Sequence, residues 1–149
     1  LVNQLSENNL KVCILGKGWD QVKNNLNKNI SLLDLKFDEY NLIYKDSKVY
    51  CNPSLVEGGP ISLLEAFASG CIICSTPVGL FFNICLEDKL SHLISFERNS
   101  KIWKNKIIDI CQDNLSENDY RKIIYDRKNK IKESNFKKLS RTIEEHIFI

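Results

Sequence analysis

Two glutamates flank a glycine pair at the point where the sequence predicts the start of a helix. Glu57 and Glu65 are eight positions apart, around Gly58-Gly59-Pro60. Carboxylates only accept hydrogen bonds, so they suit ligand hydroxyls, and a helix N-terminus attracts a phosphate. The combination predicts a ligand with hydroxyls at its ends and a charged middle, such as a nucleotide sugar. On the pattern alone, the simpler explanation is favoured, in which the glutamates are surface charges and partners of the helix dipole in the first turn.

The backbone of the same segment offers donors to such a ligand. The first N–H groups of a helix have no partner within the helix, and glycine lets the backbone approach a ligand closely. Proline has no N–H, so Pro60 contributes no donor. The usable N–H groups are therefore expected on Gly58, Gly59, Ile61 and Ser62.

The remaining sequence predicts the elements that position this segment. We expect strands over residues 11–15, 30–35, 48–51, 71–76 and 91–96, and helices over residues 19–28, 39–46, 61–69, 81–87, 100–111, 116–133 and 136–147. Several strand segments are apolar throughout, which is typical of parallel sheets buried on both faces. The sequence thus predicts an α/β fold, a Rossmann-like parallel sheet with helices on both faces.

Ligands of such sheets bind beyond the carboxyl ends of the strands. The loops expected there are residues 16–18, 52–60 and 76–79, so the two glutamates belong to one of three candidate binding loops.

Three helices carry local signals of their position. Pro60 suits the first turn of the helix over 61–69, and Gly70 suits its end. Its expected apolar stripe is Leu63, Leu64, Phe67 and Ala68. The helix that opens at Ser100 is expected to direct inward Ile102, Trp103, Ile107 and Ile110. Ser116 and Asp119 resemble a capping box for the helix that follows them.

The composition fits one globular domain and limits the kind of partner. The chain has 149 residues, 43% of them hydrophobic and 27% charged. A net charge of +2 is too small to indicate a nucleic-acid partner, and no apolar run reaches the roughly 18–20 residues of a membrane span. Because the chain begins at Leu1 and has no methionine, we expect a fragment of a longer protein.

One segment is strongly basic. Residues 98–141 contain 13 Lys or Arg and 6 Asp or Glu. The simpler interpretation is a solvated helical face, and the sharper one is contact with anionic lipid headgroups. We therefore expect a cytoplasmic protein, with a peripheral position at a membrane as the alternative.

The six cysteines are interpreted as small apolar residues. Most lie in apolar, strand-like runs, where cysteine packs as a hydrophobe. Cys71 and Cys74 form a C-x-x-C pair, but residues three apart on a strand point to opposite faces. We therefore expect no metal site there, and reduced thiols suit the cytoplasm.

Residues 53–79 contain an ordered set of motifs. They are P-S at residues 53–54, E-G-G-P at 57–60, L-L-E-A-F-A-S-G at 63–70 and V-G at 78–79. This arrangement resembles, without gaps, the donor-domain signature of retaining GT-B glycosyltransferases of the family-4 type. Glu57 and Glu65 match its E-x7-E pair, and Gly16-Lys17-Gly18 resembles its G-x-G turn.

The resemblance implies a role for each motif. Residues 1–149 would be the nucleotide-sugar-binding, C-terminal half of a GT-B fold. Glu57, the implied catalytic residue, would bind hydroxyls of the transferred sugar, and Glu65 would bind the nucleotide ribose. The sugar and diphosphate of the donor would contact the backbone of Gly58, Gly59, Ile61 and Ser62. The nucleotide base would lie near Gly16, Lys17 and Gly18. Such hexosyltransferases use UDP- or GDP-sugars with retention and need no metal or other cofactor.

The match also has departures. The Arg and Lys that grip the diphosphate in this family precede the present start, and Lys17 would replace them only in part. The N-terminal acceptor-binding domain of the same chain is missing, so we expect the fragment to be inactive. Ile72 and Phe82-Asn83 replace a proline and a glutamate of the family pattern.

Two alternatives stay open. A non-catalytic pseudo-glycosyltransferase would keep the fold for protein interactions, and the change at Phe82-Asn83 points that way. A nucleotide-sugar epimerase of the same fold would need a catalytic histidine or acid arrangement, which the sequence does not indicate.

Overall fold

Five short parallel strands form the centre of the fold. The computed structural model describes residues 1–36, 39–79, 88–94, 99–113 and 115–133. Strand β1 (Val12–Leu15) pairs with β2 (Ile30–Leu33). A second group has the order β3-β4-β5, with bounds Val49–Asn52, Ile72–Ser75 and Ser91–Leu93. All three pairings are parallel, as the sequence predicts.

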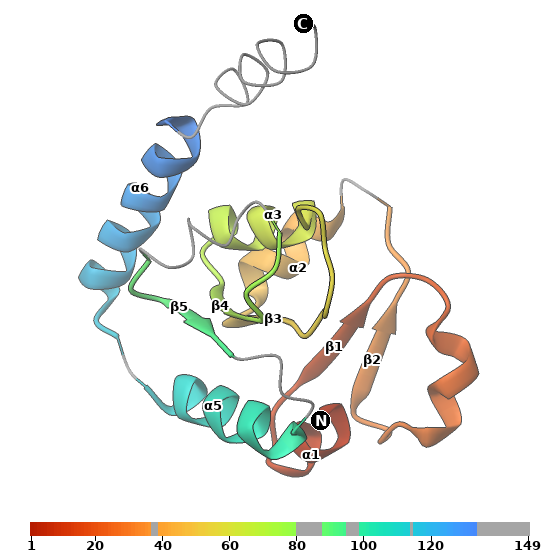
Figure 1. Cartoon of the computed structure of the whole chain (residues 1–149). Helices are drawn as coiled ribbons and strands as arrows, with labels where there is room; N and C mark the ends of the chain where they lie inside the picture. The colour runs from red at the N-terminus through yellow and green to blue at the C-terminus, as the bar shows by residue number, and fades with distance from the viewer. Residues whose placement is uncertain (37–38, 80–87, 95–98, 114, 134–149) are drawn as a thin grey trace, which may run out of the picture.

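Helices cover both faces of the strands (Figure 1). Helices α2 (Tyr40–Asp46) and α3 (Ile61–Ser69) lie on one face. Helices α1 (Val2–Glu7) and α5 (Ser100–Gln112) lie on the other. The predicted α/β fold with helices on both faces is therefore confirmed, and the core is divided between the two sides.

Strand β4 contributes to both halves of the core. Ile72 and Cys74 pack on the α5 side, whereas Cys71 and Ile73 pack on the α3 side. Burial raises the pKa of the Cys71 thiol to about 11 and that of Cys74 to about 12, so both stay protonated at neutral pH. In the described ranges no group of metal-ligating side chains is found, and Cys85 lies outside them.

The helices differ from the sequence-based expectation in three places. Helix α1 was not predicted, since it has no side-chain cap and no acidic first turn. Residues 19–28 form a 3-10 helix at Trp19–Asn25 instead, with no buried residue to favour a regular amphipathic helix. Ile102 is 41% exposed, because the inward face of α5 is set by residues 103, 107 and 110.

Helix boundaries follow local capping chemistry. Helix α5 begins at Ser100, as predicted, and Asn99 caps it, with its Oδ1 accepting from the N–H of Lys101 at 3.0 Å. Helix α6 (Glu117–Glu133) follows the predicted cap, in which Asp119 N–H donates to Ser116 Oγ at 3.2 Å. The expected helices over 81–87 and 136–147 lie outside the described residues.

A buried arginine of the basic segment fastens α6 to the core. Arg127 is 1% exposed, so the interpretation of this segment as a solvated face is wrong for this residue. Its guanidinium donates to Asp88 at 2.9 and 2.7 Å and to the carbonyl of Cys71 at 2.7 Å. It also lies 4.3 Å from the centre of the Phe67 ring. Helix α6 is therefore tied to α3 and to the start of β4.

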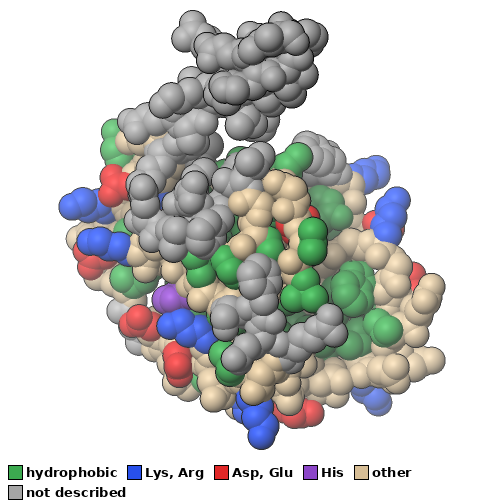
Figure 2. Space-filling model, in the orientation of Figure 1, with side chains coloured by type: hydrophobic (Ala, Val, Ile, Leu, Met, Phe, Trp, Pro, Cys, Tyr) green, Lys and Arg blue, Asp and Glu red, His purple; other side chains and the backbone are tan. Residues whose placement is uncertain are grey.

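The face of the molecule drawn in Figure 2 shows no strong segregation of charge. Positive and negative side chains are interspersed around the margin of the face in Figure 2. Within the described part of the chain, no helix is both long and apolar enough to cross a bilayer.

Acid should weaken the tie between α6 and the core. Burial alone would raise the pKa of Asp88, but the hydrogen bonds and charge of Arg127 outweigh it and hold that pKa below its ordinary value. The pair therefore stabilises the fold fully above the unfolded-state pKa and loses this contribution as the pH falls through the folded-state pKa. The urea concentration at the midpoint of unfolding should therefore decrease as the pH is lowered from about 5 to about 3. The Asp88→Asn variant should lack the part of this decrease that comes from protonation of Asp88. An equal decrease in the variant and the unmodified chain would show that Asp88 is not responsible for it.

Candidate functional site

The helix that follows the glycine pair begins where the sequence predicts. Helix α3 starts at Ile61, and Gly70 ends it in a left-handed conformation with φ of 104°. Pro60 was expected within the first turn but is the N-cap, because its ψ of 104° is extended. The Pro60 carbonyl accepts from the N–H groups of Leu63 and Leu64 at 3.0 and 3.3 Å. The first turn is thus well formed, and its opening is fixed by the loop before it.

Four backbone donors remain free at this opening. Among the described residues, the N–H groups of Gly58, Gly59, Ile61 and Ser62 have no backbone acceptor. Gly58 is exposed and Gly59 is half-buried. Free N–H groups at and just before a helix start can bind an anion.

The side chain of Glu57 is held in the loop by Ser54. The Ser54 hydroxyl donates to Glu57 Oε1 at 2.9 Å, and Glu57 itself is exposed. The carbonyl of Ser54 accepts a hydrogen bond from Thr76 Oγ1. The loop after β3 is therefore bound to the loop after β4, and Glu57 keeps one carboxylate oxygen for a ligand. In the sequence, Ser54 stands out only as part of the P-S motif, which does not predict this contact.

Two neighbouring tyrosines are each affected by the charge of one of the two glutamates. Tyr50 of β3 shares a hydrogen bond of 2.8 Å with Ser62 Oγ, and its ring lies 5.9 Å from that of Tyr44. Burial is the main cause that raises the pKa of both phenols. The charge of Glu57 adds to the effect at Tyr50, and that of Glu65 adds to it at Tyr44. Both carboxylates therefore lie within electrostatic reach of one aromatic cluster.

The glycine turn after β1 lies at the same edge of the fold. Gly16 and Gly18 have φ of 110° and 86°, and Gly16 N–H donates to the carbonyl of Leu33 at 3.0 Å. Leu15, the last residue of β1, packs against the apolar cluster that contains α3. Lys17 is exposed. The turn thus follows a strand end next to α3, as the sequence predicts.

The loop after β4 packs against Gly59 and Pro60. Thr76 N–H donates to the carbonyl of Asn52 at 3.1 Å. Gly79 has φ of 72°, and a Cβ placed on it would lie 3.1 Å from the backbone of Gly59 and 3.0 Å from Pro60 Cδ. The two loops are therefore in close contact. Phe82 and Asn83, on which a departure from the family pattern was argued, lie outside the described residues.

An unsatisfied amide lies at the end of β3. Asn52 is 7% exposed, and its Oδ1 accepts from Ser54 N–H at 3.4 Å. Its Nδ2 is buried and has no hydrogen-bond partner among the described residues. A buried donor without a partner costs free energy, so this atom is a candidate for contact with a ligand. Its place at the end of a predicted strand is the one signal for it in the sequence.

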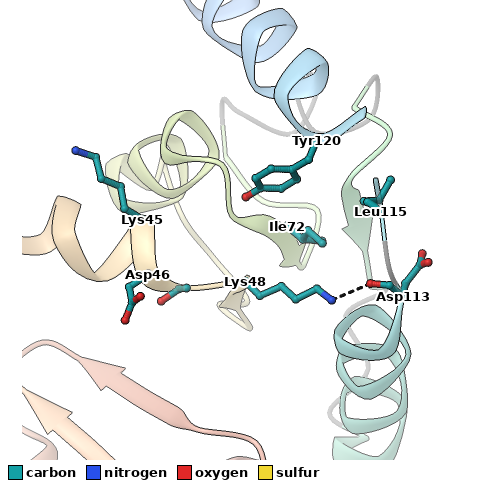
Figure 3. A pocket seen from close by; sticks show the side chains of 8 residues that line it. Lys45, Asp46, Lys48, Ile72, Asp113, Leu115 and Tyr120 are labelled. Atoms are coloured by element: carbon teal, nitrogen blue, oxygen red, sulfur yellow. Dashed lines mark hydrogen bonds between the residues drawn. The ribbon is translucent and has the colours of Figure 1, made fainter. Parts of the chain in front are cut away.

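Two cavities lie at the other edge of the sheet. One has a volume of about 310 Å³ and is lined where β3 and β4 begin, by Lys48, Ile72 and Tyr120 among others (Figure 3). Lys48 Nζ already donates to the carbonyls of Cys111 and Asp113, both at 2.8 Å. The second cavity, of about 630 Å³, lies between β5, α5 and α6 and has side chains of both charges. Neither cavity contains a residue of the site predicted from the sequence.

The carboxyl edge thus gathers features suited to a phosphate- and hydroxyl-bearing ligand. The free amides, Glu57 and the hydroxyls of Ser54 and Thr76 follow the ends of the paired strands β3 and β4, where α/β sheets bind ligands. Glu65 lies in the second turn of α3, the helix that follows β3. Comparison with curated proteins finds no match. The family model described as "Glycosyl transferases group 1" matches residues 1–113, which include every predicted site residue. The chain therefore belongs to the group 1 glycosyltransferases.

Proposed function

We propose that this chain binds the donor of a retaining hexosyl transfer, a UDP- or GDP-sugar, at the start of α3. The observation that carries the proposal is the set of four free N–H groups between two carboxylates. A diphosphate is stabilised there by the free amides and by the helix dipole. Charge that develops on the leaving diphosphate would be stabilised in the same way.

Each carboxylate has a separate role in this proposal. Glu57, oriented by Ser54, accepts from hydroxyls of the transferred sugar. Glu65, on the second turn of α3, accepts from the ribose. The turn over residues 16–18 borders the base. The family resemblance supports these assignments, and no metal is needed in them.

The chain is expected to bind the donor without transferring its sugar. In the enzymes that it resembles, the acceptor is bound by a separate N-terminal domain. Leu55, Val56 and Ile61 are exposed around the loop, which suits a surface covered by the donor or by such a domain. Transfer by the 149-residue chain alone would contradict this part of the proposal.

Calorimetric titration with UDP, GDP, ADP and their sugars tests the two roles separately. Glu65→Gln should weaken binding of the preferred nucleoside diphosphate and of its sugar alike, by roughly tenfold. Glu57→Gln should weaken only the nucleotide sugar, since the free diphosphate lacks the group that Glu57 contacts. Glu117→Gln, an exposed glutamate of α6, should change neither affinity. Binding of none of these ligands to the unmodified chain would overturn the proposal.

A further inference from the structure

The hydroxyl groups of Tyr50 and Ser62 form a hydrogen bond at the start of α3. Their oxygens are 2.8 Å apart and join β3 to the first turn of α3. Side chains on a helix lean toward its N-terminus. Ser62 Oγ therefore lies on the side of α3 at which an anion would bind, next to the free N–H of the same residue.

Either hydroxyl could donate in this hydrogen bond, and the relative acidity of the two groups favours Tyr50 as the donor. Burial is the largest of the causes that raise the pKa of Tyr50, so the phenol keeps its proton at neutral pH. A phenol is more acidic than an aliphatic alcohol and is the better donor, whereas the serine oxygen is the better acceptor. With Tyr50 donating to Ser62 Oγ, the serine proton is left for a third group.

We propose that Tyr50 holds the Ser62 hydroxyl as a proton donor to a phosphate oxygen of the nucleoside diphosphate bound at the start of α3. The inference rests on the proposed function and deepens it. Tyr50 is a positioning residue, because it acts through Ser62. The Ser62 hydroxyl adds a side-chain donor to the four backbone donors.

An independent observation points to a ligand at the same place. Asn52 follows Tyr50 by two residues on β3, so both side chains lie on the same face of the sheet. Its buried Nδ2 has no partner among the described residues. The carboxyl end of β3 therefore carries a donor without a partner among the described residues, on the face of the sheet from which Tyr50 reaches Ser62.

Titration of the 149-residue chain with UDP, GDP and ADP, and with the nucleosides that lack the diphosphate, tests the role of the pair. Tyr50→Phe should weaken the preferred nucleoside diphosphate by roughly tenfold and leave its nucleoside unchanged. Ser62→Ala should produce the same loss, and the double variant no further loss, because the residues act as one unit. Ser62→Thr keeps the hydroxyl and should retain affinity.

Tyr120→Phe is the matched control for a purely structural role. Tyr120 also uses its hydroxyl to fasten α3, at the opposite end, by donating to the carbonyl of Gly70. It should lower stability without changing affinity. The inference is overturned if Tyr50→Phe behaves like Tyr120→Phe, or if it weakens nucleoside and nucleoside diphosphate equally. If the unmodified chain binds no nucleoside diphosphate, the proposed function fails and this inference with it.

Discussion

Replacing Arg127 by methionine should lower the free energy of unfolding by about 3–5 kcal/mol, the usual cost of removing one partner of a buried ion pair. The substitution leaves the Asp88 carboxylate in a nearly water-free site, since the two side chains are 1% and 5% exposed. It also removes the donors to the carbonyls of Cys71 and Phe67. Urea unfolding followed by circular dichroism at neutral pH measures the loss.

Helix α6 supplies its own control for this experiment. Arg121 pairs with Glu117 one turn away, but both side chains are about three-quarters exposed, at 74% and 76%. Arg121→Met should therefore cost at most about 0.5 kcal/mol. Adding Asp88→Asn to Arg127→Met removes the stranded charge and should recover part of the lost stability. Equal losses for the two arginine variants would show that burial does not govern the effect.

The parts of the fold that the sequence predicts well are those with local signals. The strands are apolar runs that end at turn residues, so their existence and parallel arrangement follow from the pattern, although residues 30–35 shorten to Ile30–Leu33. Helix α3 has the predicted end because Gly70 adopts the left-handed conformation that stops a helix. Opposite faces for Cys71 and Cys74 follow from the strand period alone.

Contacts between distant residues could not be predicted in this way. Arg127 and Asp88 are 39 residues apart, and nothing in either segment separates a buried arginine from the solvated ones around it. The contact of Tyr50 with Ser62 depends on how β3 packs against α3, which no local pattern encodes. Helix α1 is six residues long and lacks a capping side chain, so its formation depends on packing.

The candidate site was predicted in part from local sequence signals and depends in part on contacts between distant residues. Glu57, Glu65 and the glycine pair were found because they are close in sequence and match a family motif. Ser54 holds the Glu57 side chain from three residues away, whereas Tyr50 reaches Ser62, at the start of α3, only in the folded chain. The motif therefore predicts which groups meet the ligand, whereas the fold determines how firmly they are held.

Gly79→Ala should also be strongly destabilising, at about 2–5 kcal/mol. The left-handed backbone of Gly79, with φ of 72°, costs an L-residue roughly 1–2 kcal/mol. The added methyl group would also press on the backbone of Gly59 at 3.1 Å, and overpacking of this kind costs about 1–3 kcal/mol. Thermal or urea unfolding measures the total.

Gly18→Ala separates the two contributions to this cost. Gly18 also has positive φ, at 86°, but a Cβ there would meet nothing within 4 Å, so only the backbone term of about 1–2 kcal/mol should appear. Because Gly79 touches the glycine pair that precedes α3, its alanine variant should also displace the free amides and weaken binding of the preferred nucleoside diphosphate. Equal destabilisation by the two variants, with unchanged affinity for Gly79→Ala, would mean that the loop after β4 does not hold the amides in place.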